Sequence, residues 1–116
     1  MKSILFLVLA LNFELANVIA PPQLFNTSLT ITVRNELGNT VEGVAVKLFE
    51  KVEDYNKEVN AIAEGITDAK GVVKFNKLKP EAVFILGRKG EIDNAGGGEK
   101  TVLEKGRFNK VTIVIQ

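Results

Sequence analysis

The chain has 116 residues and a formal net charge of +1, which is the size of one small domain. Apolar residues make up 46% of it and charged residues 25%, a balance that supports a packed core and excludes a disordered polar chain. It contains no cysteine and no histidine. The composition therefore excludes disulfide frameworks, thiol nucleophiles and thiolate zinc sites, and it removes the usual general base. We expect no cofactor, no metal and no catalytic centre.

The first segment of the chain has the features of an export signal. Lys2 provides the positive charge, residues 4–11 form an apolar run, and residues 18–20 have the small-residue spacing of a cleavage site. A membrane anchor or a buried strand are the alternatives. An anchor needs about twenty nearly unbroken apolar residues, however, and Glu14 interrupts this one.

These features predict three parts of the chain. They are a signal peptide at 1–20, an extended lead-in at 21–28 and one domain at 29–116. The mature product is expected to be secreted or periplasmic, with no membrane span after the signal is removed.

Seven short segments have the pattern of β-strands, mostly with apolar and polar residues in alternation. They are residues 29–34, 44–48, 59–67, 72–75, 82–86, 101–103 and 110–116. A short helix is the alternative at 59–67. Turns are expected at 35–39 and 68–71, a solvated loop at 53–58 and a glycine-rich loop at 91–98. The pattern predicts an all-β fold, a sandwich or a barrel.

The last predicted strand, residues 110–116, is β-prone, lacks proline and carries one charge, at Lys110. We favour an arrangement in which Val111, Ile113 and Ile115 face the core and neighbouring strands flank this one on both sides. That arrangement predicts a monomer. A strand at a sheet edge would instead be a template for pairing with another chain.

Two stretches carry a resemblance to a known family. Residues 38–48, GNTVEGVAVKL, and residues 67–80, TDAKGVVKFNKLKP, resemble carboxypeptidase regulatory-like and Cna B-type domains. The resemblance implies a seven-stranded Greek-key β-sandwich of the transthyretin-like type. It specifies the fold much better than the function.

The resemblance also bears on chemistry. Cna B-type domains often form a Lys–Asn cross-link, and the lysine position on the first strand is Arg34 here, whose guanidinium is a poor nucleophile. Asn109 is expected to lie before the last strand and not inside it. Hydroxyisourate hydrolases share the fold class, but their histidines and C-terminal signature are absent.

The densest polar cluster is the best candidate for a recognition site. It consists of Arg88, Lys89, Glu91, Asp93 and Asn94. Glu91, Asp93 and Asn94 are too few for calcium, which takes six to eight oxygen ligands. Binding residues usually lie on loops at one end of a sandwich, where we expect this cluster.

The leading functional interpretation is a non-catalytic interaction module that binds a protein or glycan partner at the cell envelope through end loops or an edge strand. The first alternative is a structural or self-assembling unit. The second is a small-molecule or carbohydrate carrier, for which Tyr55 and Phe108 are the plausible exposed rings. Nucleic acid is not an expected partner, because the chain has one tyrosine and no tryptophan and is predicted to be exported.

Overall fold

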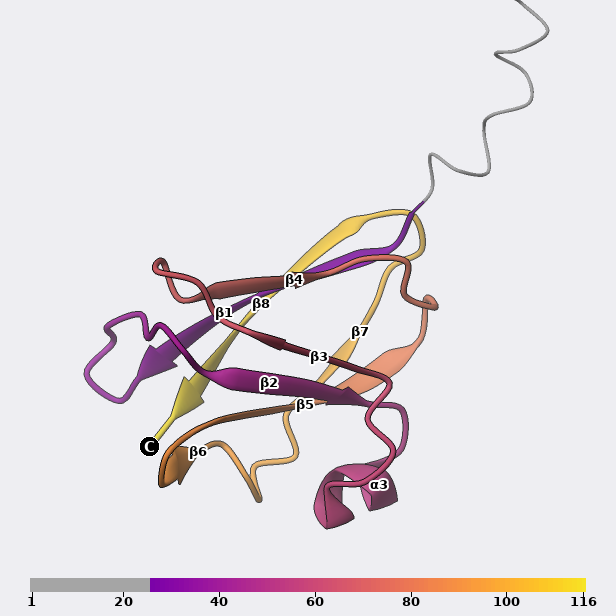
Figure 1. The fold of residues 1–116 in the computed structure, drawn as a ribbon. Helices are drawn as coiled ribbons and strands as arrows, with labels where there is room; N and C mark the ends of the chain where they lie inside the picture. Colours follow the sequence, from indigo (N-terminus) through magenta and orange to yellow (C-terminus); the bar gives the residue numbers. More distant parts are fainter. Residues whose placement is uncertain (1–25) are drawn as a thin grey trace, which may run out of the picture.

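The computed structural model describes residues 26–116, so the predicted signal peptide and most of the lead-in lie outside the described residues. The elements are β1 (Ser28–Asn35), β2 (Ala45–Phe49), α3 (Val52–Lys57), β3 (Ala63–Ile66), β4 (Val72–Phe75), β5 (Ala82–Lys89), β6 (Ile92–Asp93), β7 (Lys100–Val102) and β8 (Phe108–Ile115) (Figure 1). Within the described part of the chain, no helix is long and apolar enough to cross a membrane.

The strands form two sheets, which confirms the predicted β-sandwich. One sheet is three-stranded in the order β4-β1-β8, and the other is five-stranded in the order β3-β2-β5-β6, with β7 also pairing with β5 (Figure 1). β1 and β8 are parallel along their length, whereas the other pairs are antiparallel. β5 is the central strand of the larger sheet, with β2 on one side and β6 and β7 on the other.

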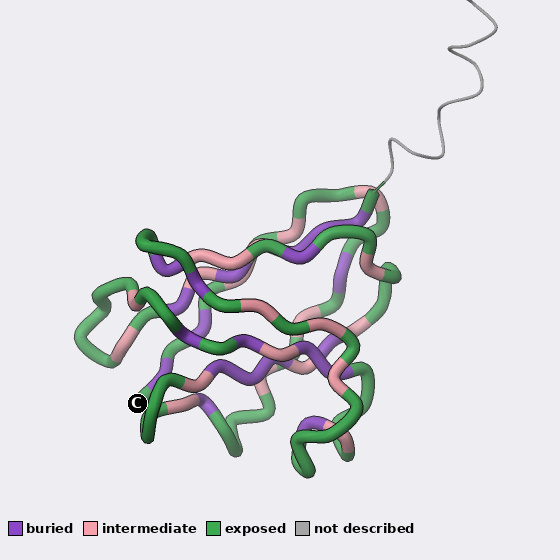
Figure 2. Tube along the Cα trace, viewed as in Figure 1, coloured by how far each residue is buried: buried purple, intermediate pink, exposed green. Residues whose placement is uncertain are grey.

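The core lies between the two sheets because alternate residues of each strand face inward. Figure 2 shows the resulting alternation of buried and exposed positions along the trace. The main core consists of Leu29, Ile31, Val33, Val44, Val46, Leu48, Phe75, Val83, Ile85, Leu103, Ile113 and Ile115. In the segments at 44–48 and 72–75 the alternate apolar residues face the core, with Val73 packing against it from a partly buried position.

The turn before β4 forms as the sequence predicts. Asp68 Oδ1 accepts hydrogen bonds from the backbone N–H groups of Lys70 (2.9 Å) and Val72 (3.0 Å). Gly71 has a φ of +77°, and a Cβ there would lie 2.9 Å from the backbone nitrogen of Val41. Glycine is therefore required at this position for both conformation and space.

The solvated loop predicted at 53–58 is wrong, because most of this stretch is the helix α3. The helix packs on the outer face of β2 and β5, where Tyr55, Phe49 and Leu86 form a second, smaller core. Burial of Tyr55 supplies the apolar anchor that so short a helix needs. The strand expected at 59–67 forms over Ala63–Ile66, and the two-residue β6 forms inside the stretch expected to be a loop.

The position of β8 differs from the prediction in one respect. Ile113 and Ile115 are buried and Val111 packs against the core, as predicted. The expected flanking on both sides is wrong for the described residues, because β8 is an edge of the three-stranded sheet. β6 and β7 pair with β5 in the other sheet, and β6 meets the chain at the end of β8, where Asp93 and Gln116 exchange two backbone hydrogen bonds.

Candidate functional site

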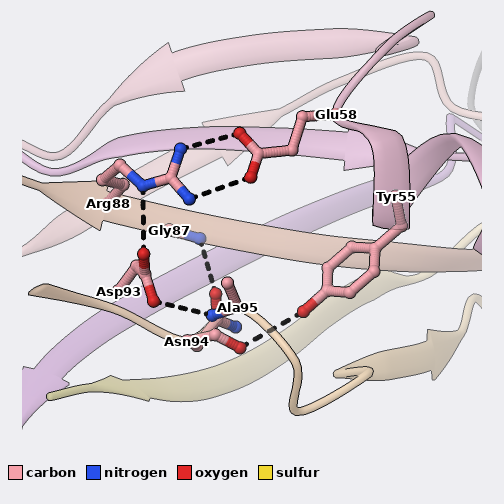
Figure 3. Close-up of polar contacts among 7 residues, drawn as sticks. All are labelled: Tyr55, Glu58, Gly87, Arg88, Asp93, Asn94 and Ala95. Atoms are coloured by element: carbon pink, nitrogen blue, oxygen red, sulfur yellow. Dashed lines mark hydrogen bonds and ion pairs between the residues drawn. The ribbon is translucent and has the colours of Figure 1, made fainter.

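The predicted recognition residues lie together at the β5–β6 hairpin, where Arg88 is the centre of a polar network (Figure 3). Arg88 Nη1 and Nη2 donate to the two carboxylate oxygens of Glu58, at 2.7 and 2.9 Å. Its Nε donates to Asp93 Oδ2 at 3.1 Å. The planar guanidinium thus ties the end of α3 to the hairpin through a bidentate pair and a third bond.

The charges of this network stabilise one another. Hydrogen bonding to Arg88 lowers the pKa of Glu58. The pKa of Asp93 is lowered first by the backbone N–H of Ala95, which donates to its Oδ1 at 3.0 Å, and then by Arg88. The two carboxylates raise the pKa of Arg88, with the bond to Glu58 as the larger cause. All three groups are therefore ionised at neutral pH and already paired.

Asn94 is buried, although it lies in the stretch expected to be a glycine-rich loop. Its Oδ1 accepts the backbone N–H of Gly87 at 2.8 Å, and its Nδ2 donates to the carbonyl of Ile85 at 3.0 Å. The side chain thereby provides hydrogen-bond partners for two backbone groups of the central strand β5. Asn94 is a structural residue of the sheet, and its side-chain amide is occupied.

Tyr55 connects the network to the second core. Its hydroxyl donates to the backbone carbonyl of Asn94 at 3.2 Å (Figure 3). Its ring packs edge-on against Phe49, with the ring centroids 5.9 Å apart. The expectation of an exposed ring is wrong for Tyr55, which is 3% exposed, and right for Phe108, which is 75% exposed. Sugar stacking therefore cannot use Tyr55.

The remaining predicted residues are at the hairpin turn. Lys89 Nζ donates to the backbone carbonyl of Glu42 at 2.7 Å, which ties the turn to the loop before β2. Glu91 is exposed and has no side-chain hydrogen bond to any described residue. A partner-binding role for the five residues stays a prediction, and their observed contacts hold the fold together.

Sequence reasoning missed Tyr55 and Glu58 as members of this network. The sequence did contain a signal for the first, since a single tyrosine inside a charged stretch commonly marks an amphipathic anchor with its ring buried and its hydroxyl bonded. Glu58 had no comparable signal, because its pairing with Arg88 joins residues 30 positions apart.

The two positions compared with the family's cross-link, Arg34 and Asn109, do not meet, in agreement with the expectation that no cross-link forms. Asn109 is inside β8, so the prediction that it precedes the last strand is wrong. Asn109 pairs with Leu29 in the β1–β8 register, whereas Arg34 pairs with Val114, near the other end of the ladder. The side-chain nitrogen Nδ2 of Asn109 donates to backbone carbonyls within the same domain, including that of Ser28 at 3.0 Å.

Among residues 26–116, no group of three or more histidine, cysteine, aspartate or glutamate side chains is arranged to hold a metal ion. Of the three side chains considered for calcium, Asp93 and Asn94 use their oxygens on the protein, and Glu91 alone is left exposed. The geometry of the hairpin thus fits a structural joint between helix and sheet.

Comparisons with known proteins agree with this description of the fold. The chain resembles the backbone protein of group B streptococcus pilus 2b, with a TM-score of 0.59 at 14% identity over 77% of this chain and 40% of that one. It also resembles BcpA, the major pilin subunit of Bacillus cereus, with a TM-score of 0.53 at 18% identity over 79% and 30% of the two chains. The fold is that of a Cna B-type β-sandwich.

A third structure with this Cna B-type fold is the Bacillus anthracis TIE protein, with a TM-score of 0.56 at 15% identity over 78% of this chain and 17% of that one. The chain thus spans less than half the length of each of these proteins. No family model matches the chain, and no curated protein matches it in sequence. The likeness therefore concerns the fold alone.

Proposed function

We propose that this chain is a non-catalytic structural β-sandwich unit of a secreted or cell-surface protein assembly. The observation that carries the proposal is the likeness in fold to two proteins described as a pilus backbone protein and a major pilin subunit. A unit of the same fold is suited to the same kind of structural role. The proposal includes export directed by residues 1–20.

The polar hairpin supports a structural role. Arg88, Asp93 and Asn94 use their side chains on Glu58 and on the backbone of the central strand, so they stiffen the joint between α3 and the sheet. An interaction module that binds a protein or glycan at this hairpin is the weaker proposal, because a partner there would have to break these bonds or rely on Glu91.

The proposal is tested in the native host with the full chain carrying a C-terminal epitope tag. Fractionation and immunogold electron microscopy should find the tag at the cell surface or in the medium, within assemblies much larger than the chain. N-terminal sequencing of the exported material should begin near Pro21. A soluble cytosolic product that retains Met1 and sediments as a small species would contradict the proposal.

A further inference from the structure

The edge of β8 that faces away from β1 has unused backbone groups. The N–H of Ser28 donates to the carbonyl of Arg107, and Gln116 exchanges two backbone bonds with Asp93 on the opposite side. Because backbone groups alternate in direction along a strand, odd-numbered residues of β8 bond to β1 and even-numbered residues point away from it. The residues whose N–H and C=O groups face the open edge are therefore Phe108, Lys110, Thr112 and Val114.

The side chains of the same residues lie on the outer face of the sheet and are exposed. Phe108 is 75% exposed and Val114 is 45% exposed, at the two ends of the free edge. A groove of about 480 Å³, lined by residues of β7 and by residues 107–110, separates the first half of this edge from the other sheet. From Phe108 to Val114, the outward-facing backbone groups of this edge make no hydrogen bond to any described residue of the other sheet, so an incoming strand can pair with them.

The other side of the sandwich is protected. β3 has four residues, of which Glu64 is charged and exposed. β3 also packs closely against β4, since a Cβ on Gly65 would lie 2.8 Å from Val73 Cγ2. Short, charged and covered edges resist pairing with other chains, whereas β8 has eight residues and a single charge.

We infer that β8 pairs with β8 of a second copy of this chain, antiparallel and about a two-fold axis, to form one continuous sheet across the dimer. The register that uses all the free residues places Phe108 opposite Val114 of the second copy and Lys110 opposite Thr112 of the second copy. An aromatic ring facing a β-branched side chain is a favourable cross-strand pair.

Neighbouring registers fit less well. A shift by two residues in one direction places Lys110 opposite Lys110 of the second copy, and like charges directly opposite are destabilising. A shift in the other direction places Phe108 opposite Gln116, whose backbone is already bonded to Asp93. The edge is therefore self-complementary in one register, which is the property that a closed two-fold interface requires.

This inference rests on the proposed function, because a structural unit needs contacts with its neighbours, and it names the first of those contacts. It replaces the sequence-based expectation of a monomer, which assumed that β8 is flanked on both sides.

The first test measures the mass of the purified full chain by light scattering over a range of concentrations. The expected mass is twice that of the chain, falling to the single-chain mass in the variants Val114→Lys and Thr112→Pro. Proline at 112 removes an N–H that faces the open edge and leaves the ladder to β1 intact. Ile66→Lys is the matched control, since it adds the same charge at the exposed edge strand β3 and should leave the dimer unchanged. Circular dichroism and thermal melting verify that each variant is folded.

The second test measures the register by disulfide cross-linking. The chain has no cysteine of its own, so only the introduced cysteines can form a disulfide. The double variant Lys110→Cys with Thr112→Cys should form a covalent dimer on mild oxidation, because directly opposite residues are within disulfide reach. Each single variant should not, because its cysteines are then diagonal neighbours, about 7–8 Å apart. Cross-linking of Thr112→Cys alone would overturn the register.

A chain that stays monomeric at all concentrations would overturn the self-pairing and point to a strand of another protein as the occupant of this edge. A dimer that survives both Val114→Lys and Thr112→Pro would also overturn it, because the interface would lie elsewhere. Neither result contradicts the proposed structural function, because that proposal is tested separately by the location and size of the assemblies in the native host.

Discussion

Replacing Asn94 by alanine tests whether the polar hairpin is structural. The substitution leaves the N–H of Gly87 and the carbonyl of Ile85 without their partner in a buried part of the central strand. Each buried backbone group without a partner costs about 1–3 kcal/mol, so the free energy of unfolding should fall by about 2–6 kcal/mol. For a domain with a total stability of about 5–15 kcal/mol, this is a large loss.

The measurement is equilibrium denaturation in urea, followed by far-ultraviolet circular dichroism and by the fluorescence of the single tyrosine, Tyr55. Glu91→Ala is the matched control three residues away, and it should change the free energy of unfolding by no more than about 0.5 kcal/mol. If Asn94→Ala were as stable as this control, the assignment of Asn94 as a structural residue would be refuted.

Asn94→Asp provides a second, pH-dependent arm. The carboxylate still accepts the N–H of Gly87 but cannot donate to the carbonyl of Ile85, whereas the protonated acid can do both. The folded state therefore raises the pKa of this carboxyl. The protonated side chain stabilises the folded protein at low pH, and this contribution to the free energy of unfolding is lost as the pH rises through the folded pKa. The difference in stability between Asn94→Asp and the parent should shrink on going from pH 7 to about pH 4.

Three further predictions concern the turn, the helix and the ion pair. Gly71→Ala should destabilise the domain by about 1–3 kcal/mol more than Gly38→Ala in urea denaturation. Both glycines have positive φ, but a Cβ at 71 would lie 2.8 Å from its nearest neighbour, whereas a Cβ at 38 meets nothing within 4 Å. Tyr55→Phe should cost about 1 kcal/mol for the lost hydroxyl bond, and Tyr55→Ala about 3–5 kcal/mol for the lost packing, measured in the same way. Because Arg88 lowers the pKa of Glu58, this pair contributes stability at neutral pH that is lost as the pH falls through the folded pKa of Glu58. In Arg88→Gln, the free energy of unfolding should therefore fall less steeply between neutral and acid pH than in the parent.

The sequence predicts the two sheets well because their signals are local. Alternation in the segments at 29–34 and 44–48 identifies inward positions directly, and Asp68 and Gly71 specify a turn through their own backbone chemistry. Each of these features depends on residues a few positions apart. The predicted fold class and the core therefore agree with the structure.

The errors concern features that depend on distant residues. The helix α3 is stabilised by the packing of Tyr55 on Phe49 and Leu86, and Leu86 lies on a strand far along the chain. Whether β8 is an edge depends on the choice of β6 and β7 to pair with β5, which alternation within β8 cannot reveal. The five polar residues lie on one hairpin, but only the structure shows that Arg88, Lys89, Asp93 and Asn94 are bonded within the protein and that Glu91 is exposed.

The parallel pairing of β1 and β8 has a mechanical consequence. Ser28 begins one strand and Ile115 ends the other, so the chain enters and leaves the domain at opposite ends of the same ladder (Figure 1). A force that pulls on the two ends of the domain loads all the hydrogen bonds of this ladder together, in shear. In an antiparallel hairpin the same force would open the bonds one after another, like a zipper. Since Arg34 and Asn109 lie too far apart along the ladder to be joined, the hydrogen bonds and the core packing between β1 and β8 are what resist such tension.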